Sequence, residues 1–206
     1  MESGILAIET STRRGSVALW RGGRVVSEAS FYANRSHNSA VFEPLKKLLE
    51  LGGDEIGMVV VGTGPGSYTG ARVGIAAGQG VAMVKGIGLV GVASVCAAEV
   101  DADDYAVVGD ARRGAFFWVE VKAKRMVGEV EMMLGRDALD ERIAAAGLET
   151  VTFDEGLSGI GLSRPVAGRL AESAARWVPE QEATAAVEPI YLGAPFVTTA
   201  KPRGIG

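Results

Sequence analysis

Short apolar runs divide the first half of the chain into predicted strands and helices. Residues 5–8 and 16–20 are mainly apolar, residues 24–28 contain Val25 and Val26, and polar turns that contain Arg and Gly separate the three segments. Runs of this length joined by tight connections predict three antiparallel strands. Apolar residues then recur at helical spacing over residues 38–51, which predicts a helix. Pro44 lies either in the first turn of that helix or at a kink, because proline lacks a backbone donor.

A parallel crossover is predicted next. Residues 58–61 and 89–92 are continuous apolar runs, as expected of buried strands. A helix of about four turns, from residue 70 to residue 85, separates them and is followed by Gly86. A strand, a helix and a strand of these lengths predict a right-handed parallel crossover.

The second half of the chain repeats this order of elements. Both halves open with an acidic residue, an Arg-Arg-Gly turn and a strand that contains Trp20 or Trp118. Such self-similarity indicates two related units. We therefore expect an α/β protein with an actin-like (ASKHA) fold made of two RNase H-like lobes. The second-half pattern predicts strands at residues 105–108, 115–121, 126–132 and 149–153 and helices at residues 136–146 and 166–177.

The length of the chain suits two small lobes. We expect an N-terminal RNase H-like lobe at residues 1–102 and a smaller C-terminal one at residues 103–192, each close to a common domain size. Residues 193–206 contain two prolines and three glycines and show little periodicity. This last segment is expected to be an irregular tail.

Composition and charge indicate a folded protein that does not bind nucleic acid by itself. Hydrophobic residues make up 48% of the 206 residues, which is enough for two cores. The formal net charge is −4, whereas nucleic-acid-binding domains carry a dominant basic surface. With single residues Cys96 and His37, the chain lacks an internal disulfide and the usual zinc sites. No secretory signal pattern is present, and Gln79 and Lys85 interrupt the longest apolar region, so we expect a cytoplasmic protein without a membrane span.

The first predicted strand ends in the polar residues Glu9, Thr10 and Ser11. Actin-type ATPases place a carboxylate and hydroxyl groups at this point. A carboxylate there can hold a metal ion, while hydroxyl and backbone N–H groups can hold phosphate. An ordinary strand end with a polar turn explains the same residues, and for this motif alone we favour that interpretation.

A glycine-rich loop at residues 62–70 precedes the second predicted helix. Glycines at a helix N-terminus let the backbone approach another group, such as a phosphate. A tight turn that packs the helix closely on its sheet is an equally good explanation. The loop is not a P-loop, because it lacks Gly-Lys-Ser/Thr. Gly64, Gly66 and Ser67 join the polar strand end as candidate cofactor-binding residues.

Residues 62–74, which read G-T-G-P-G-S-Y-T-G-A-R-V-G, closely resemble the signature loop of the TsaB (YeaZ) family. Residues 5–19 are similar to the opening strands of that family. Residues 36–39, 110–114 and 189–192 occur in the family's order. The resemblance therefore spans nearly the whole chain.

This resemblance implies an actin-like fold and a non-catalytic scaffold role in the synthesis of threonylcarbamoyladenosine beside the anticodon of tRNA. Family members bind and activate the catalytic TsaD subunit, which uses metal and nucleotide, and a separate ATPase, TsaE, completes the machinery. We therefore expect no catalytic residue, metal or cofactor in the isolated chain. Contact with tRNA is expected through the complex, and the chain without its partner either forms a homodimer or stays a monomer.

Two residues depart from the family pattern. Glu9 stands where the family usually has Asp, and Gly193 stands where it usually has Arg. The Glu makes the segment similar to TsaD, which however needs two metal-binding histidines four residues apart, and this chain has only His37. The single histidine also excludes a metalloprotease, although this group was formerly labelled as glycoproteases (peptidase M22-like). The alternative is a small ATP-dependent kinase or ATPase of the actin/sugar-kinase type, although residues 110–114 lack the glycine-rich phosphate loop that it needs.

The two predicted helices of the first half form the expected partner interface. Gly74, Gly78 and Ala82 lie four residues apart, and each helical glycine costs about 1 kcal/mol relative to alanine. Such a stripe of small residues packs either on the chain's own sheet or against a partner helix, and the resemblance favours the partner. The other helix adds an apolar stripe that is wide enough for two surfaces, made of Val41, Phe42, Leu45, Leu48 and Leu49.

Overall fold

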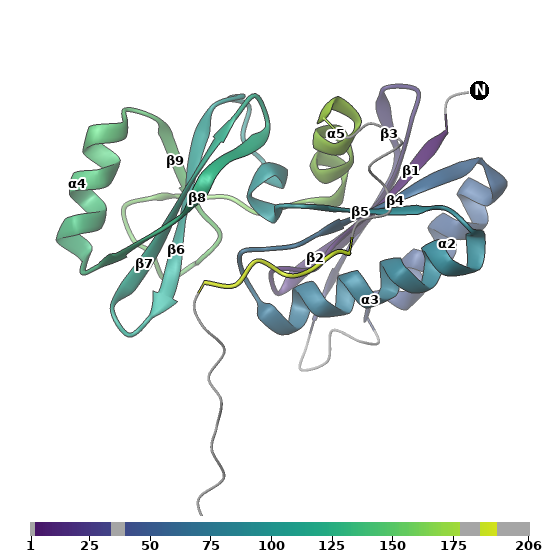
Figure 1. Ribbon diagram of the computed structural model, residues 1–206, viewed down its shortest axis with the longest axis horizontal. Helices are drawn as coiled ribbons and strands as arrows, with labels where there is room; N and C mark the ends of the chain where they lie inside the picture. The colour runs from purple at the N-terminus through teal and green to yellow at the C-terminus, as the bar shows by residue number, and fades with distance from the viewer. Residues whose placement is uncertain (1–2, 34–39, 178–185, 193–206) are drawn as a thin grey trace, which may run out of the picture.

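The computed structural model describes residues 3–33, 40–177 and 186–192, which form two lobes (Figure 1). The first lobe contains a five-stranded sheet with the order β3-β2-β1-β4-β5. The first three strands pair antiparallel, whereas β4 and β5 continue the sheet in parallel with β1. The strands are β1 (Gly4–Glu9), β2 (Arg14–Arg21), β3 (Arg24–Tyr32), β4 (Ile56–Gly62) and β5 (Gly88–Val92).

Two helices cover one face of this sheet. They are α2 (Phe42–Gly52), which the short helix η1 (Gly53–Glu55) follows, and α3 (Tyr68–Lys85). Alternate residues of each strand point to this face, where they form a buried cluster with the helices. Pro44 is the third residue of α2 and therefore lies in its first turn, where its missing N–H has no intrahelical acceptor. The expected helix entry at residues 36–39 lies outside the described residues.

The second lobe repeats the sheet of the first. Its strand order is β10-β9-β6-β7-β8, in which the fourth strand again pairs parallel with the first. The helix α4 (Arg136–Ala146) joins the third strand to the fourth, as α2 does in the first lobe. The repeated topology confirms the expected actin-like fold of two RNase H-like lobes. The strands are β6 (Tyr105–Arg112), β7 (Ala115–Lys122), β8 (Arg125–Leu134), β9 (Glu149–Thr152) and β10 (Gly161–Leu162).

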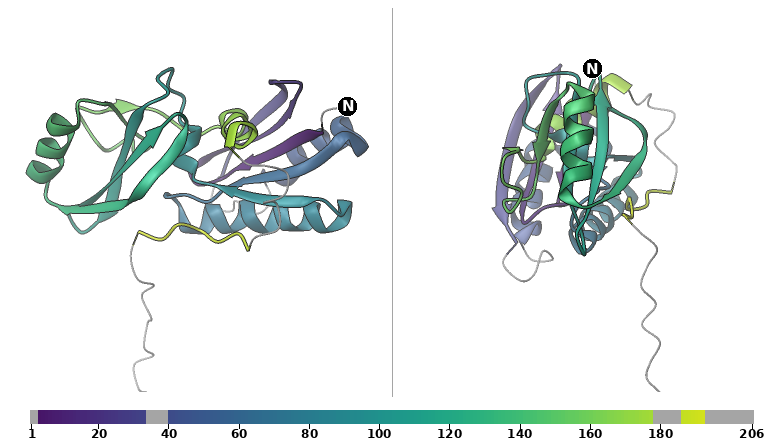
Figure 2. Two further views of the ribbon diagram at one scale, coloured as in Figure 1. Left: turned by 45° about the horizontal axis from the view of Figure 1, so that its top comes forward. Right: turned by 90° about the vertical axis from the view of Figure 1, so that its left-hand side faces the viewer.

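The last described helix, α5 (Ala167–Trp177), packs on the first lobe although it follows the strands of the second. It covers the face of the first sheet opposite to α2 and α3 (Figure 2). Leu170, Ala171 and Ala174 are buried there against Ala7 and Val60. This packing differs from the expectation, which placed the helix in the C-terminal lobe at residues 103–192. The other expected lobe boundaries stay a prediction.

The longest apolar region of the sequence divides into separate elements. It contributes α3, β5 and the short helix η2 (Ser94–Ala97). Across the described residues, no helix is both long enough and apolar enough to span a membrane.

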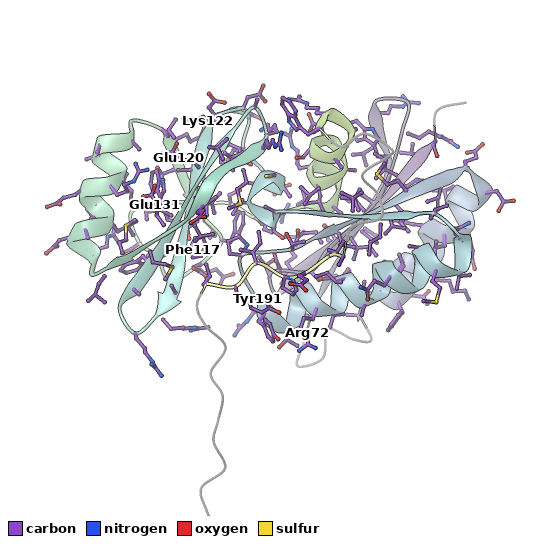
Figure 3. All side chains as sticks on the ribbon, viewed as in Figure 1. Arg72, Phe117, Glu120, Lys122, Glu131 and Tyr191 are labelled. Atoms are coloured by element: carbon purple, nitrogen blue, oxygen red, sulfur yellow. The ribbon has the colours of Figure 1, made fainter. Side chains whose placement is uncertain are left out.

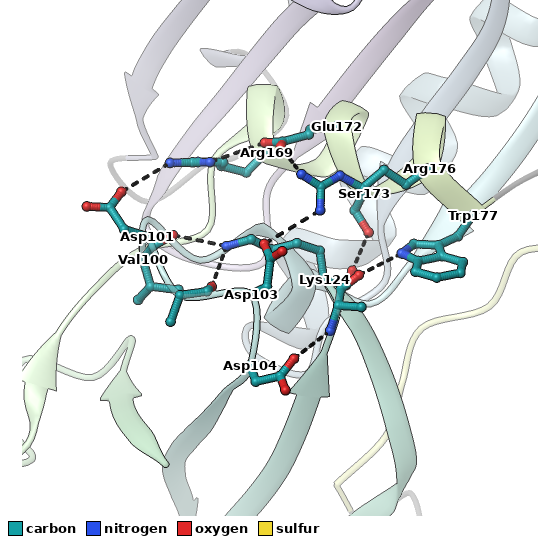
Figure 4. Close-up of polar contacts among 12 residues, drawn as sticks. Val100, Asp101, Asp103, Asp104, Lys124, Arg169, Glu172, Ser173, Arg176 and Trp177 are labelled. Carbon is teal, nitrogen blue, oxygen red and sulfur yellow. Dashed lines mark hydrogen bonds and ion pairs between the residues drawn. The ribbon is translucent and has the colours of Figure 1, made fainter.

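The turn between β7 and β8 ties the second lobe to the connection between the lobes (Figure 4). Lys124 in this turn is buried. Its Nζ donates hydrogen bonds to the carbonyl oxygens of Val100 and Ala102, at 3.0 and 2.7 Å. The ammonium group also lies 5.3 Å from the centre of the Tyr105 ring. Burial lowers the pKa of the Lys124 amine, but the two carbonyl groups and the ring stabilise its charged form.

The same turn is bonded to α5. The carbonyl oxygen of Lys124 accepts a hydrogen bond from the Ser173 hydroxyl, and that of Ala123 accepts one from Trp177 Nε1, both at 2.7 Å. Because α5 lies on the first sheet, these bonds connect the hairpin of one lobe to the other lobe. We call Ala123, Lys124, Ser173 and Trp177 the interlobe clamp.

Candidate functional site

The candidate site lies at the edge of the first sheet where the parallel strands β1 and β4 end. Glu9, Thr10 and Ser11 follow one strand, and the glycine-rich loop follows the other. Ligands of open α/β sheets bind at such carboxyl ends. All three polar residues are nevertheless almost completely buried. The structure thus brings the predicted cofactor-binding residues together but covers the strand end.

The Glu9 carboxylate is enclosed by its own chain. Oε1 accepts a hydrogen bond from the Ser11 N–H at 2.6 Å. Oε2 is buried without a hydrogen-bond partner among the described residues. A side chain at position 62 would collide with this oxygen, so Gly62 leaves the space that the glutamate fills. Burial raises the pKa of Glu9, and hydrogen bonding by Ser11 and the nearby Ser94 hydroxyl opposes the shift.

The loop glycines allow the chain to approach itself. A Cβ at Gly66 would lie 2.5 Å from the Ser11 carbonyl oxygen, and one at Gly70 would collide with the Thr10 carbonyl oxygen. The Ser67 N–H donates to the Ser11 carbonyl oxygen at 2.6 Å. Of the two explanations offered by the sequence, close packing of loop and helix therefore accounts for these glycines.

Polar groups that could bind a phosphate are used within the protein. The Ser67 hydroxyl accepts a hydrogen bond from the Gly70 N–H, at 3.2 Å, and so caps α3. The Gly64 N–H donates to the Ser94 hydroxyl at 3.0 Å. No group of three metal-ligating carboxylate, imidazole or thiol side chains occurs within the described part of the chain. The residues present do not fit a bound nucleotide, and weak or absent nucleotide binding stays a prediction.

The turn after the first strand of the second lobe, between β6 and β7, is a tight hairpin. Residues 112 and 113, both arginine, and Gly114 have positive φ angles. The Asp110 side chain accepts a hydrogen bond from the Arg112 N–H at 2.7 Å. The short turn between β6 and β7 therefore has no loop that could surround a phosphate.

The expected partner stripe of α3 faces the wrong way for a partner. Gly74 lies against Thr10 and Ile8, and Gly78 lies against Val61. The prediction that Gly74, Gly78 and Ala82 contact a partner helix is therefore wrong, because the sheet of the same lobe already occupies that side.

The expected interface residues of α2 divide between its two faces. Val41, Leu45 and Leu48 are buried in the core of the first lobe, and Leu49 is partly buried against it. Phe42 is 57% exposed. Phe42 is therefore the residue of this predicted set that is available to a partner.

The outer face of α3 carries a second stripe of small and apolar residues. Ala76, Gly80 and Val84 recur every four residues and are exposed, as is Met83. No atom lies within 4 Å of a Cβ built at Gly80. We call Ala76, Gly80, Met83 and Val84 the outer α3 face. The sequence contained this stripe, but two small-residue stripes on one helix cannot be told apart without knowing which side meets the sheet.

Two exposed tyrosines, Tyr68 and Tyr191, lie together with Arg72 at the N-terminus of α3. The Arg72 guanidinium lies 5.3 Å from the Tyr68 ring centre, and the Tyr68 and Tyr191 rings are 5.4 Å apart. Figure 3 shows Arg72 and Tyr191 at this end of the first lobe. A separate pair lies on the other face of the sheet, which α5 covers: Arg14 is 5.7 Å from the ring centre of Tyr32, which is opposite it in the β2–β3 register. Sequence reasoning did not identify the contact between Tyr68 and Tyr191, because the two residues are distant in the chain.

The fold and this site define a class: a two-lobed actin-like protein whose own chain fills the position of the phosphate loop. Residues 24–167 match the family model described as "TsaD: tRNA N6-adenosine threonylcarbamoyltransferase". The Escherichia coli K12 protein "tRNA threonylcarbamoyladenosine biosynthesis protein TsaB" is 30% identical over 165 residues, which cover 74% of this chain and 71% of that protein. A Bacillus subtilis protein of the same name is 29% identical over 55% of this chain and 52% of its own length.

Solved structures agree with these relatives. A Pseudomonas aeruginosa protein described as similar to the peptidase YEAZ matches with a TM-score of 0.71 and 25% identity, over 93% of this chain and 100% of that one. YeaZ from the same organism matches with a TM-score of 0.67 and 23% identity, over 92% and 100%, and so supports the fold. The chain belongs to the TsaB (YeaZ) family, within the wider group that the TsaD model describes.

Proposed function

We propose that this protein is a non-catalytic subunit in the biosynthesis of threonylcarbamoyladenosine in tRNA, where it binds and activates a TsaD-type catalytic subunit. Membership of the TsaB family supports the pathway. The outer α3 face is the observation that carries the scaffold role. A TsaE-type ATPase and tRNA are the further partners that we propose for the assembled complex.

The chemistry of the chain supports a role without catalysis. A single histidine and a single cysteine cannot supply a pair of metal-binding histidines. Cys96 is buried, and burial raises the pKa of its thiol to about 11, which keeps it in the unreactive protonated form. The buried position of Glu9 likewise keeps this carboxylate away from any substrate. No contact in the site favours the kinase alternative.

The outer α3 face has the properties of a helix-packing surface. Met83 is 84% exposed and Val84 is 88% exposed, although solvent-facing helix positions usually carry polar side chains. The exposed Gly80 lowers the stability of an isolated helix by about 1 kcal/mol relative to alanine, yet it lets another backbone approach closely. Phe42, at the start of α2, is a further exposed apolar side chain.

A partner that shares the fold can present equivalent helices. Because residues 24–167 match the TsaD model, a TsaD-type subunit carries a related lobe. Two such lobes can pair through like faces around a pseudo-twofold axis, so that α2 and α3 form a bundle with their counterparts. The same face could pair two copies of this chain when the partner is missing.

Co-purification with the TsaD-type subunit of the same cell tests the proposal. Gly80→Arg places a long charged side chain on the outer α3 face and should abolish the heterodimer while the protein stays folded. Gly156→Arg is the matched control, because a Cβ at Gly156 also meets no atom within 4 Å but lies in the second lobe. Size-exclusion chromatography measures association, and circular dichroism measures folding.

A folded Gly80→Arg variant that binds TsaD as the wild type does would refute the interface. Loss of binding in both variants would show that charge alone, rather than position, weakens the complex. Robust ATPase or transferase turnover by the pure chain would refute the non-catalytic role.

A further inference from the structure

The outer α3 face continues toward the N-terminus of its helix. Tyr68, Arg72 and Ala76 follow one another at four-residue spacing, so their side chains are neighbours on one side of α3. All three residues are exposed. The same spacing continues through Gly80 and Val84, which belong to the outer α3 face. The surface proposed for a partner helix therefore extends beyond Ala76 to an arginine and a tyrosine.

The last described segment of the chain adds a second ring at this end of α3. Val187 packs into the apolar cluster between α3 and the first sheet. The Ile190 N–H donates a hydrogen bond to the Thr63 carbonyl oxygen at 2.8 Å. These contacts hold Tyr191 in a place where its ring centre lies 5.4 Å from that of Tyr68. The structure thus fixes both rings at one end of the helix.

Arg72 and the two tyrosines form one connected group. The Arg72 Nη1 donates a hydrogen bond to the Tyr68 hydroxyl at 3.1 Å. Hydrogen bonding with Tyr68 raises the pKa of Tyr191, so its phenol is neutral at physiological pH. Each tyrosine is nevertheless 49% exposed. We call Tyr68, Arg72 and Tyr191 the aromatic–arginine end of α3.

The charge of Arg72 is not neutralised by a carboxylate in the described part of the chain, where its guanidinium contacts only Tyr68. Glu188 is close enough to act on the pKa of Tyr191, but no ion pair joins it to Arg72 among the described residues. Tyrosine and arginine are enriched among the few residues that dominate the binding energy of protein interfaces. The aromatic–arginine end therefore offers an uncompensated charge between rings to the partner that covers the outer α3 face.

Small residues determine where a partner helix can cross α3. Another backbone can approach most closely at Ala76 and Gly80, because Ala76 is small and exposed and a Cβ at Gly80 meets no atom within 4 Å. Around a pseudo-twofold axis that runs across the helices, the counterpart helix packs antiparallel to α3. The N-terminal end of α3 then meets the C-terminal end of the counterpart. That end carries carbonyl groups without intrahelical donors and a partial negative charge.

We propose that the aromatic–arginine end of α3 is the hot spot of the interface with the TsaD-type subunit, where it binds the C-terminal end of the partner's counterpart helix. This inference rests on the proposed function. Arg72 donates hydrogen bonds to the last carbonyl groups of that helix. The rings of Tyr68 and Tyr191 pack on its final turn and exclude water from the charged contact, which strengthens it.

The surroundings of this group favour a protein partner over RNA. Sites for single-stranded RNA combine aromatic rings with a positively charged groove that follows the backbone. The aromatic–arginine end contains one arginine, and the whole chain has a net charge of −4. Its stripe continues directly into Ala76 and Gly80, as expected of a helix-packing surface.

Calorimetric titration of the full chain with the TsaD-type subunit tests the inference. Tyr191→Ala and Arg72→Gln should each weaken the heterodimer at least about 5-fold, the loss that separates a hot-spot residue from a neutral contact. Tyr32→Ala is the matched control for the ring, because Tyr32 is 65% exposed but lies on the face of the sheet that α5 covers. Arg24→Gln is the control for the charge, because Arg24 is exposed on the edge strand β3. Circular dichroism verifies folding, and the exposed helix position of Arg72 keeps the test valid if Tyr191→Ala loosens its own segment.

Gly80→Arg separates this inference from the proposed function. If Gly80→Arg abolishes the heterodimer but Tyr191→Ala and Arg72→Gln bind as the wild type does, the inference is overturned and the proposed function stands. An equal loss of affinity in Tyr32→Ala also overturns the inference. If the wild type does not bind, the proposed function fails and the inference fails with it.

An unmodified tRNA transcript added to the assembled complexes tests the competing RNA contact by fluorescence anisotropy. Unchanged heterodimer affinity together with weaker tRNA binding by Tyr191→Ala and Arg72→Gln would overturn the inference in favour of RNA. Weaker heterodimer affinity, with both control variants unchanged, supports the contact with the partner helix.

Discussion

The orientation of α3 predicts that substitutions at two glycines, two residues apart, have different effects on stability. Gly78 faces the sheet, and a Cβ there would lie 2.5 Å from Val61 Cγ1 and 3.1 Å from Leu89 Cδ1. Gly80 faces outward, and a Cβ there would meet nothing within 4 Å. Both glycines lie in the interior of the same helix, Tyr68–Lys85. The helix-propensity gain on replacement by alanine is therefore nearly the same at both positions.

The two alanine variants should consequently differ by the packing energy alone. Replacement of glycine by alanine in a helix stabilises by about 1 kcal/mol, which is the net effect expected for Gly80→Ala. An added methyl group in a well-packed core costs about 1–3 kcal/mol. Gly78→Ala should thus range from neutral to about 2 kcal/mol less stable than the wild type, which places it about 1–3 kcal/mol below Gly80→Ala. For a chain of this size the gap corresponds to roughly 2–12 °C in Tm.

Urea unfolding followed by circular dichroism measures both variants. Equal stabilisation by the two alanines would refute the inward orientation of Gly78, because the methyl group would then have met no neighbour. Gly78→Trp extends the test: the ring cannot fit between helix and sheet, so this variant should fail to fold as a monomer. A folded Gly78→Trp monomer would instead support the original prediction that Gly74, Gly78 and Ala82 contact a partner helix.

Two further predictions concern buried polar groups. Lys124→Met should destabilise the protein by about 1–3 kcal/mol in urea unfolding, because it leaves two buried carbonyl oxygens without a donor. It should also speed hydrogen exchange at the interlobe clamp. Lys122→Met is the control, because Lys122 is exposed. Glu9→Gln should change how stability depends on pH. The folded-state pKa of Glu9 lies above its ordinary value of 4.5, so its contribution to stability is complete below about pH 4.5 and is lost as the pH rises through the folded-state pKa. The glutamine variant should therefore gain stability relative to the wild type as the pH rises above this value, and identical pH profiles in urea unfolding would contradict the burial argument.

The sequence by itself determined the order of the elements and the class of the fold. Apolar runs with turns between them predicted the strands of both sheets except β10, because the alternation of strand side chains and the spacing of helical ones are local properties. The predicted third strand of the first half ended at residue 28, whereas β3 continues to Tyr32. The missed residues do alternate, since Ala29 and Phe31 pack against the core while Tyr32 is exposed, so the predicted end of this strand was wrong.

Only the tertiary structure decided what each motif contacts. The glycines of residues 62–70 were equally consistent with a phosphate and with close packing, and the proximity of Thr10 and Ser11, more than fifty residues away, gives the answer. The small stripe of α3 was assigned to a partner because periodicity shows that a face exists but not which neighbour covers it. The position of α5 on the first sheet and the contact of the Tyr68 ring with the Tyr191 ring also depend on long-range contacts. Spacing along a chain fixes side-chain direction within one element, whereas a site arises where elements distant in sequence meet.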